Sequence, residues 1–368
     1  MSRLDDLSAR GQSVWIDSLS REWLDTGFLA KLMQEDAVVG VTSNPSIFQK
    51  ALAEGGWYDD QLRELADKED LSEVFIQLAE RDIEQACDLM APVHARTDGV
   101  DGFVSIEVDP TLADDTEATL QQALRFHADI DRPNLYVKIP GTKAGLPAIE
   151  ECIAQGRSIN VTLIFSLQRY AEVVEAYIRG VERLLEAGGD VTRVRSVASF
   201  FVSRVDTEAD KRLETIGTEE ALAVRGQLAV ANAKLAYQLF QREFGSERWE
   251  TLAAAGAKPQ RCLWASTSTK NPDYRDVLYV EELIGPDTVN TMPLETIEAF
   301  QDHGEIRGDT LGEDVDGAHE VFGIVEQVGV DYDDVVQTLE DEGVQKFSDA
   351  FTQLLDGIRT RRGAMVSA

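Results

Sequence analysis

The sequence predicts an α/β protein, a single-domain (β/α)8 TIM barrel with additional helices. Two observations support this fold: eight short apolar runs alternate with helical segments, and several of these runs place polar side chains on one parity. Barrels of this kind take about 250 residues, and insertions extend some beyond about 400. The 368 residues therefore fit one barrel, and we expect a single domain over 1–368.

The predicted strands are short runs rich in branched and aromatic apolar residues. In chain order they are Val14 to Asp17, Val38 to Ser43, Phe103 to Val108, Leu135 to Ile139, Ile159 to Phe165, Val194 to Phe201, Cys262 to Ser266 and Val289 to Met292. Eight strands separated by helices are the number that closes this type of barrel.

The clearest predicted helix runs from Leu167 to Glu186. Ser166 is placed to cap its amino end, apolar residues recur with helical spacing, and Gly188 and Gly189 end it. Further helical stretches predict additional helices on the barrel over 49–97 and 206–255, and a C-terminal helical layer over 304–361.

A doubly wound open sheet is the alternative architecture, because it uses the same strand and helix units. Such a sheet binds dinucleotides through a Gly-x-Gly-x-x-Gly turn after a strand, and no predicted strand ends in that turn. No repeat or linker suggests a second domain. The barrel is therefore the favoured fold.

The charge balance limits the partners of this chain. Lys and Arg number 35 and Asp and Glu number 67, a formal net charge of -32. This charge repels nucleic acid and anionic lipid surfaces, so we expect neither nucleic-acid nor membrane binding. An anionic substrate would need a local basic site.

We expect a cytoplasmic protein. The start of the chain lacks a secretory signal, and no apolar stretch approaches the roughly 20 residues of a membrane span. The cysteines, Cys87, Cys152 and Cys262, are scattered and odd in number, which suits a reducing compartment better than a disulfide framework.

Strand parity indicates which side chains point into the barrel, because successive side chains alternate between the two faces of a strand. In the fourth strand Leu135, Val137 and Ile139 form the outward apolar parity, which places Lys138 inside. The same test places Asp17, Asn44, Glu107 and Thr162 inside and Leu163 outside. These inward residues fall near the carboxyl ends of their strands, where barrel enzymes carry out chemistry.

Lys138 alone would be as consistent with a residue at an exposed rim. With Asp17 and Glu107 on the matching parity, three ionisable groups gather inside the barrel, and stability does not explain them because burying charge is costly. The set therefore favours a catalytic site.

The residue types predict imine chemistry. Burial lowers the pKa of an amine, so that its neutral form can attack a ketone and form an imine. We expect Lys138 to be the nucleophile, Asp17 to take a proton from a substrate hydroxyl, and Glu107 with Thr162 to hold a water that carries protons. The four histidines lack metal-ligand spacing, so we expect neither a metal nor a cofactor.

At these residues the sequence resembles the transaldolase family, in the longer bacterial type with an extended C-terminal helical region. The segments that carry the resemblance cover 14–21 (VWIDSLSR), 40–48 (GVTSNPSIF), 104–109 (VSIEVD), 137–142 (VKIPGT), 160–166 (NVTLIFS) and 264–270 (WASTSTK). Six such segments in the family's order extend across nearly the whole chain.

The resemblance implies a transferase of the pentose phosphate pathway. It would pass a dihydroxyacetone unit from sedoheptulose 7-phosphate or fructose 6-phosphate to glyceraldehyde 3-phosphate or erythrose 4-phosphate through a lysine Schiff base. The family's imine lysine matches Lys138, its acid/base matches Asp17, and the residues that hold its catalytic water match Glu107 and Thr162.

The resemblance also implies substrate-binding residues. Asn44 and Ser199 match those that bind the dihydroxyacetone hydroxyls, and Arg204 and Ser266 match phosphate contacts. Phe201 occupies an aromatic position near the catalytic water and is phenylalanine, as in the transferases. Many relatives carry an arginine shortly after the serine that matches Ser266; here Lys270 is the substitute.

Two other functions stay open at this stage. A simple fructose-6-phosphate aldolase would use the same imine and release free dihydroxyacetone without an acceptor. A non-catalytic barrel that binds a metabolite would have no need of Lys138, Asp17, Glu107 and Thr162 together. We expect a monomer or a homodimer.

Overall fold

The computed structural model describes residues 2–366, and its eight strands form one closed parallel barrel in chain order. The strands are β1 Gln12–Ile16, β2 Val38–Val41, β3 Val104–Glu107, β4 Leu135–Pro140, β5 Ile159–Ile164, β6 Ser196–Phe201, β7 Arg261–Ala265 and β8 Thr288–Met292. Each lies within about two residues of a predicted strand, so the predicted (β/α)8 barrel is confirmed.

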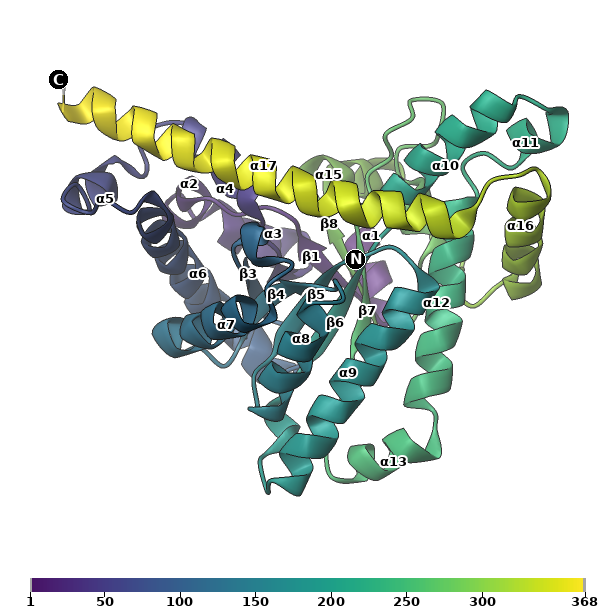
Figure 1. The fold of residues 1–368 in the computed structure, drawn as a ribbon, viewed down its shortest axis with the longest axis horizontal. Helices are drawn as coiled ribbons and strands as arrows, with labels where there is room; N and C mark the ends of the chain where they lie inside the picture. The colour runs from purple at the N-terminus through teal and green to yellow at the C-terminus, as the bar shows by residue number, and fades with distance from the viewer. Residues whose placement is uncertain (1, 367–368) are drawn as a thin grey trace.

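Helices surround the barrel and cover its carboxyl end (Figure 1). The α-helices that follow β1 and β2, with α1 before them, are α1 Arg3–Ala9, α2 Arg21–Asp25, α3 Phe28–Glu35, α4 Pro45–Ala53, α5 Asp59–Glu64 and α6 Leu71–Arg96. Those between β3 and β7 are α7 Thr116–Ile130, α8 Gly145–Ala154, α9 Leu167–Glu186, α10 Ser203–Ile216, α11 Glu219–Ala223, α12 Leu228–Phe244 and α13 Glu247–Ala254. The remaining ones are α14 Leu278–Glu282, α15 Leu294–His303, α16 Val315–Gln327 and α17 Tyr332–Val366, and the short 3-10 helices are η1 Pro110–Leu112 and η2 Val191–Arg193.

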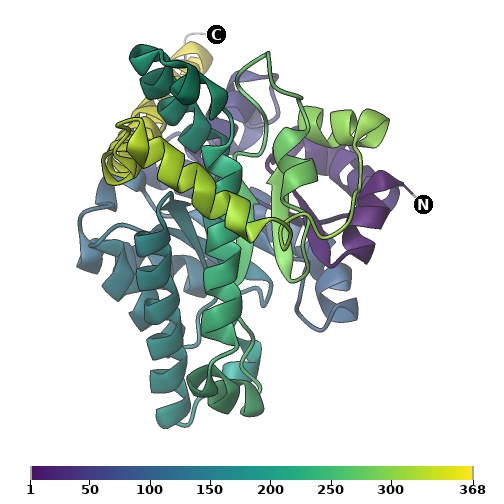
Figure 2. The same ribbon diagram turned by 90° about the vertical axis from the view of Figure 1, so that its right-hand side faces the viewer.

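Helix α9 has the predicted bounds, and Ser166 accepts a hydrogen bond from the Arg169 amide at its start. The other predicted helical regions are divided by turns: α4, α5 and α6 occupy the first, and α10 to α13 occupy the second. In Figure 2, α12 runs beside α9 along the barrel and α16 crosses α12. None of the helices in residues 2–366 has the length and apolar character needed to cross a bilayer.

Aromatic rings fill the amino-terminal half of the barrel. The rings of Phe103 and Tyr136 stack at 4.1 Å between centroids, and Trp15 lies 6.1 Å from Tyr136. Gly40 lies against the Trp15 indole, and a Cβ there would come within 2.4 Å of it, so only glycine fits. The inward parity predicted for β1, β3 and β4 therefore holds, and polar side chains are left for the carboxyl end.

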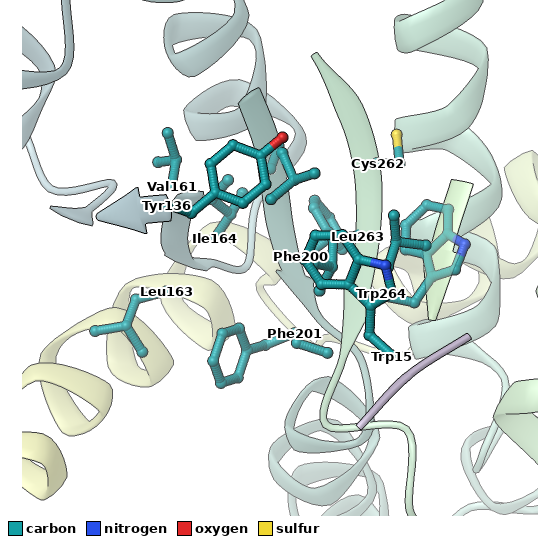
Figure 3. Packing of buried hydrophobic residues seen from close by; sticks show 14 of the residues in the cluster. Trp15, Tyr136, Val161, Leu163, Ile164, Phe200, Phe201, Cys262, Leu263 and Trp264 are labelled. Atoms are coloured by element: carbon teal, nitrogen blue, oxygen red, sulfur yellow. The ribbon is translucent and has the colours of Figure 1, made fainter. Parts of the chain in front are cut away.

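One residue departs from the predicted parity. Leu163 has a left-handed φ of 58°, and the register between β5 and β6 shifts between Val161 and Ile164. This irregularity turns Leu163 away from the ring of helices and toward α17, where its Cδ2 would lie 3.1 Å from a Cβ on Gly343. Figure 3 shows Leu163 beside the pale yellow C-terminal helix, so the prediction that Leu163 points outward was wrong.

Helix α17 crosses the carboxyl end of the barrel (Figure 1). Its buried residues form a stripe with helical spacing: Val335, Val336, Leu339, Gly343, Phe347, Ala350, Phe351, Leu354 and Ile358. This stripe packs on α4, α10 and the end of β5. The predicted helical layer over 304–361 thus contains α16 and most of α17, and α17 roofs the barrel mouth.

Candidate active site

Lys138 lies inside the barrel mouth on β4, opposite Glu107 of β3 in the strand register. Its Nζ donates to Glu107 Oε2 at 3.1 Å and to the Ser43 carbonyl at 3.0 Å. The side chains of Lys138 and Glu107 are only 6% and 2% exposed, respectively. Buried charges are retained when they are paired in this way, and the pair places an amine next to a proton acceptor.

Asp17 directly follows β1 and faces the same space. Its Oδ1 accepts a hydrogen bond of 2.6 Å from Thr42 Oγ1, and that hydroxyl lies 2.7 Å from Thr291 Oγ1. Burial raises the pKa of Asp17, while the nearby charge of Lys138 and the hydrogen bond from Thr42 act in the opposite direction. A carboxylate with a raised pKa is a stronger base, which suits proton abstraction near neutral pH.

Glu107 and Thr162 present polar atoms that the protein does not satisfy. Within residues 2–366, Glu107 Oε1 and Thr162 Oγ1 are buried and have no hydrogen-bond partner. Burial raises the pKa of Glu107, and the charge of Lys138 opposes this shift. Since unsatisfied buried polar atoms are costly, these two atoms are suited to a bound water or substrate.

Ser199 belongs to a polar network that runs across three strands. Its Oγ donates to Asn160 Oδ1 at 2.7 Å, and Asn160 Nδ2 donates to Ser105 Oγ at 3.2 Å. All three side chains are buried. Asn160 and Ser105 have the inward parity, a signal that points to a role in holding Ser199, but sequence reasoning did not select them as site residues.

Asn44 combines a structural contact with a place at the site. It is the N-cap of α4, and its Oδ1 accepts a hydrogen bond of 3.1 Å from the Ile47 amide. It also lines, with Ser43 and Glu107, a narrow cavity of about 10 Å³ under α17. A cavity of that size holds about one water molecule.

Arg204 lies in the first turn of α10, half-buried beside Phe201. Its Cζ is 5.1 Å from the centre of the Phe201 ring. Burial lowers the pKa of Arg204, and among the residues described its Nη1 is buried without a hydrogen-bond partner. A guanidinium with a free donor is suited to bind an anion.

The structure brings Ser266 to the start of α10 but leaves Lys270 outside. Ser266 has a left-handed φ of 56°, and its Oγ lies 2.9 Å from Ser203 Oγ, next to Arg204 in the chain. Lys270 is exposed and donates to Ser268 Oγ at 2.7 Å.

Phe347 of α17 is a site residue that sequence reasoning missed. Its ring centre lies 6.0 Å from Lys138 Nζ and 5.9 Å from Arg204 Cζ. The helical periodicity of α17 marks Phe347 as buried, but only the path of the helix over the barrel reveals what it covers. Residues 2–366 contain no group of three or more His, Cys, Asp or Glu side chains placed to hold a metal ion.

A parallel barrel with a paired, buried lysine and a second carboxylate at its mouth is typical of enzymes whose lysine attacks a carbonyl group. Comparison with known proteins gives the family. The family model described as Transaldolase/Fructose-6-phosphate aldolase matches residues 14–358. The chain therefore belongs to the transaldolase/fructose-6-phosphate aldolase family.

Several curated relatives share more than half of the residues. A transaldolase from Parafrankia sp. (strain EAN1pec) is 54% identical over 365 residues, which cover 99% of each chain. A transaldolase from Acidothermus cellulolyticus is 55% identical over 95% of this chain and 94% of its own. One from Thermobifida fusca is 54% identical over 99% of both chains.

Proposed function

We propose that this chain is a transaldolase that transfers a dihydroxyacetone unit from a ketose phosphate to an aldose phosphate through an imine on Lys138. The donor would be sedoheptulose 7-phosphate or fructose 6-phosphate, and the acceptor glyceraldehyde 3-phosphate or erythrose 4-phosphate, in the pentose phosphate pathway. The observation that carries the proposal is Lys138 itself, buried and bonded to Glu107 inside the barrel mouth of a transaldolase-family chain.

The first half of the reaction joins the donor to the enzyme. The nitrogen of Lys138 bonds to the C2 carbonyl carbon of the ketose phosphate, and the carbonyl oxygen takes up protons and leaves as water. Glu107 and Thr162 hold the water that carries these protons, using the atoms that have no partner in the protein. The product is a protonated imine.

The second half breaks and remakes a carbon–carbon bond. Asp17 takes the proton of the C4 hydroxyl, the electrons of the C3–C4 bond move into the imine, and the aldose phosphate leaves with a new carbonyl group. The enamine on Lys138 then attacks the acceptor aldehyde, which takes the proton back from Asp17. Hydrolysis of the new imine releases the product and frees Lys138.

Substrate binding is assigned to residues around this centre. Asn44 and Ser199 bind the dihydroxyacetone hydroxyls, and Phe201 packs beside Arg204. Arg204 and Ser266 bind the phosphate, which is supported by the free Nη1 of Arg204 and by the position of Ser266 at the start of α10. Lys270 as a second phosphate-binding cation stays a prediction.

A simple fructose-6-phosphate aldolase is the second candidate, because the family description names both activities. The two differ in their need for an acceptor. A transaldolase turns over fructose 6-phosphate only when an aldose phosphate is supplied, whereas an aldolase releases dihydroxyacetone without one. Steady release of dihydroxyacetone in the absence of acceptor would favour the aldolase. A barrel that only binds a metabolite would show neither reaction.

Borohydride trapping tests the imine directly. Reduction in the presence of fructose 6-phosphate is expected to leave a stable adduct on Lys138, located by peptide mass spectrometry. Lys138→Ala should abolish both adduct and activity. Lys143→Ala is the matched control, because Lys143 is exposed three residues after β4 and should leave both unchanged. A wild-type protein without an adduct, or an active Lys138→Ala, would refute the mechanism.

We further infer that 1–368 is one domain, that the protein is a monomer or a homodimer, and that it acts in the cytoplasm. The single domain is supported by the packing of α17 on α4 and α10. The reducing compartment is supported by Cys87, Cys152 and Cys262, which are all free and buried. Sedimentation velocity would determine the oligomeric state.

A further inference from the structure

Phe347 is the point at which α17 meets two cations of the site. The side chain is 6% exposed, and its ring faces Lys138 Nζ at 6.0 Å and Arg204 Cζ at 5.9 Å. Both distances lie within the range in which an aromatic face attracts a cation. One ring therefore contacts both the amine proposed to form the imine and the guanidinium proposed to bind phosphate.

Arg204 depends on rings rather than on hydrogen bonds for its position. Its guanidinium has the Phe201 ring at 5.1 Å and the Phe347 ring at 5.9 Å, and no protein acceptor within residues 2–366 binds its Nη1. Aromatic faces hold a guanidinium without using its N–H donors. The donors thus stay free for an incoming anion.

The position of Phe347 is set by contacts elsewhere on α17. One turn earlier, Gly343 lies against Leu163, the residue after Thr162 in β5. Arg169 bonds to Glu340 nearer the start of the helix, and Arg361 bonds to Asp59 and to the Leu52 carbonyl near its end. The ring is therefore carried by a helix that is fixed on both sides of the barrel mouth.

We propose that Phe347 is a positioning residue that holds Arg204 and Lys138 in their reactive places and thereby favours phosphorylated donors. The proposal rests on the proposed function. Phe347 does not contact the reacting atoms; it acts through the two cations. Loss of the ring should let the guanidinium of Arg204 turn from its place, which penalises a phosphorylated sugar more than an unphosphorylated one.

The test compares two donors in four proteins: wild type, Phe347→Leu, Phe347→Tyr and Leu354→Ala. Fructose 6-phosphate and fructose serve as donors, with erythrose 4-phosphate as acceptor. We expect Phe347→Leu to lower the ratio of kcat/KM for fructose 6-phosphate to that for fructose by about tenfold, the order of two lost cation–π contacts. Phe347→Tyr keeps an aromatic face and should keep the ratio.

Leu354→Ala is the control for packing, because Leu354 is buried on the same helix about two turns beyond Phe347. It should lower the melting temperature and leave the donor ratio unchanged. Should Phe347→Leu not fold, Phe347→Met takes its place, since methionine fills a similar volume without a ring. An unchanged ratio in the Leu or Met variant, or a ratio lost equally in Leu354→Ala, would overturn the proposal.

These outcomes are separate from those that test the enzyme's reaction. Borohydride trapping on wild-type Lys138 tests the proposed function alone. A normal adduct with an unchanged donor ratio in Phe347→Leu would remove the role of Phe347 and leave the transaldolase reaction standing.

Discussion

Lys138 and Glu107 form an ion pair in a place where ion pairs contribute little net stability. Burying two charges costs several kcal/mol of desolvation, which their attraction and hydrogen bonds only offset. Removing one partner of such a pair typically costs about 3–5 kcal/mol, because the other charge is left buried. Chemistry, rather than stability, therefore explains why charged side chains occupy the carboxyl end of a barrel whose other end is filled by Trp15, Phe103 and Tyr136.

The first prediction at the residue scale concerns Asp17. Asp17→Asn can still accept the hydrogen bond from Thr42, but it cannot take a proton from the substrate. We expect kcat to fall about 10²- to 10⁴-fold, the usual contribution of a general base, with a small change in KM. Steady-state kinetics would show this split. A raised KM with a normal kcat would instead assign Asp17 to substrate binding.

The second prediction separates Arg204 from Lys270. Charge-assisted hydrogen bonds contribute about 1.5–3 kcal/mol, so Arg204→Ala should raise the KM for fructose 6-phosphate roughly ten- to hundredfold. Lys270→Ala should change it less than about twofold, because Lys270 is exposed and bonded to Ser268. A comparable rise in both variants would show that Lys270 reaches the phosphate when substrate binds.

At this scale, strand parity predicts the polar centre well. Lys138, Glu107, Asp17 and Thr162 are all buried or half-buried around the barrel mouth, because a parity rule needs only the strand positions. It does not predict Phe347, since its contact with the site depends on the path of a helix that is distant in sequence. Nor does it predict the Ser43 carbonyl that accepts from Lys138, because main-chain atoms leave no sequence signal.

At the scale of elements, α17 and β5 explain each other. A regular β5 would direct Leu163 outward, but the left-handed φ of Leu163 turns its side chain under α17. Gly343 of α17 allows the helix to approach Leu163 closely. The amphipathic stripe predicts that α17 is a helix with one buried face, but a local irregularity of this kind has no signal in an apolar run such as Val161 to Phe165.

The prediction for this element uses two glycines of α17. Replacing an exposed helical glycine by alanine stabilises a helix by about 0.5–1 kcal/mol. Gly357 is exposed with nothing within 4 Å of an added Cβ, so Gly357→Ala should raise the free energy of unfolding by that amount.

Gly343→Ala is the matched comparison. A Cβ at Gly343 would lie 3.1 Å from Leu163 Cδ2 and 3.4 Å from Phe165 Cε2, so the gain in helix propensity should be lost to the closer contact. Urea unfolding of both variants would measure the difference. An equal gain in both would mean that α17 does not press on β5.

At the scale of the whole molecule, the fold was readable because eight runs of matching length repeat one strand–helix unit. Right-handed crossovers and parallel pairing then leave few ways to close the sheet. The turns that divide the helical regions 49–97 and 206–255 are weaker signals, because tertiary packing rather than composition decides where each helix ends.

The net charge of -32 leads to a prediction about salt. Like charges repel across a compact surface and destabilise it, and salt screens the repulsion over about 10 Å at 0.1 M. The melting temperature at pH 8 should therefore rise between 10 mM and about 500 mM NaCl. The rise should shrink near the isoelectric point, where the net charge vanishes. A flat or falling melting temperature at pH 8 would show that local ion pairs outweigh the net charge.

Two arginines near the end of the chain give α17 a second meaning. Arg361 bonds to Asp59 and to the Leu52 and Gly55 carbonyls, and Arg362 bonds to the Ala66 and Lys68 carbonyls, all from segments that flank α5. A carboxypeptidase that removed these last turns would leave every proposed catalytic side chain in place, yet it would free the far end of the helix that carries Phe347. Trimming of the chain from its carboxyl end should thus be legible as a gradual loss of donor selectivity.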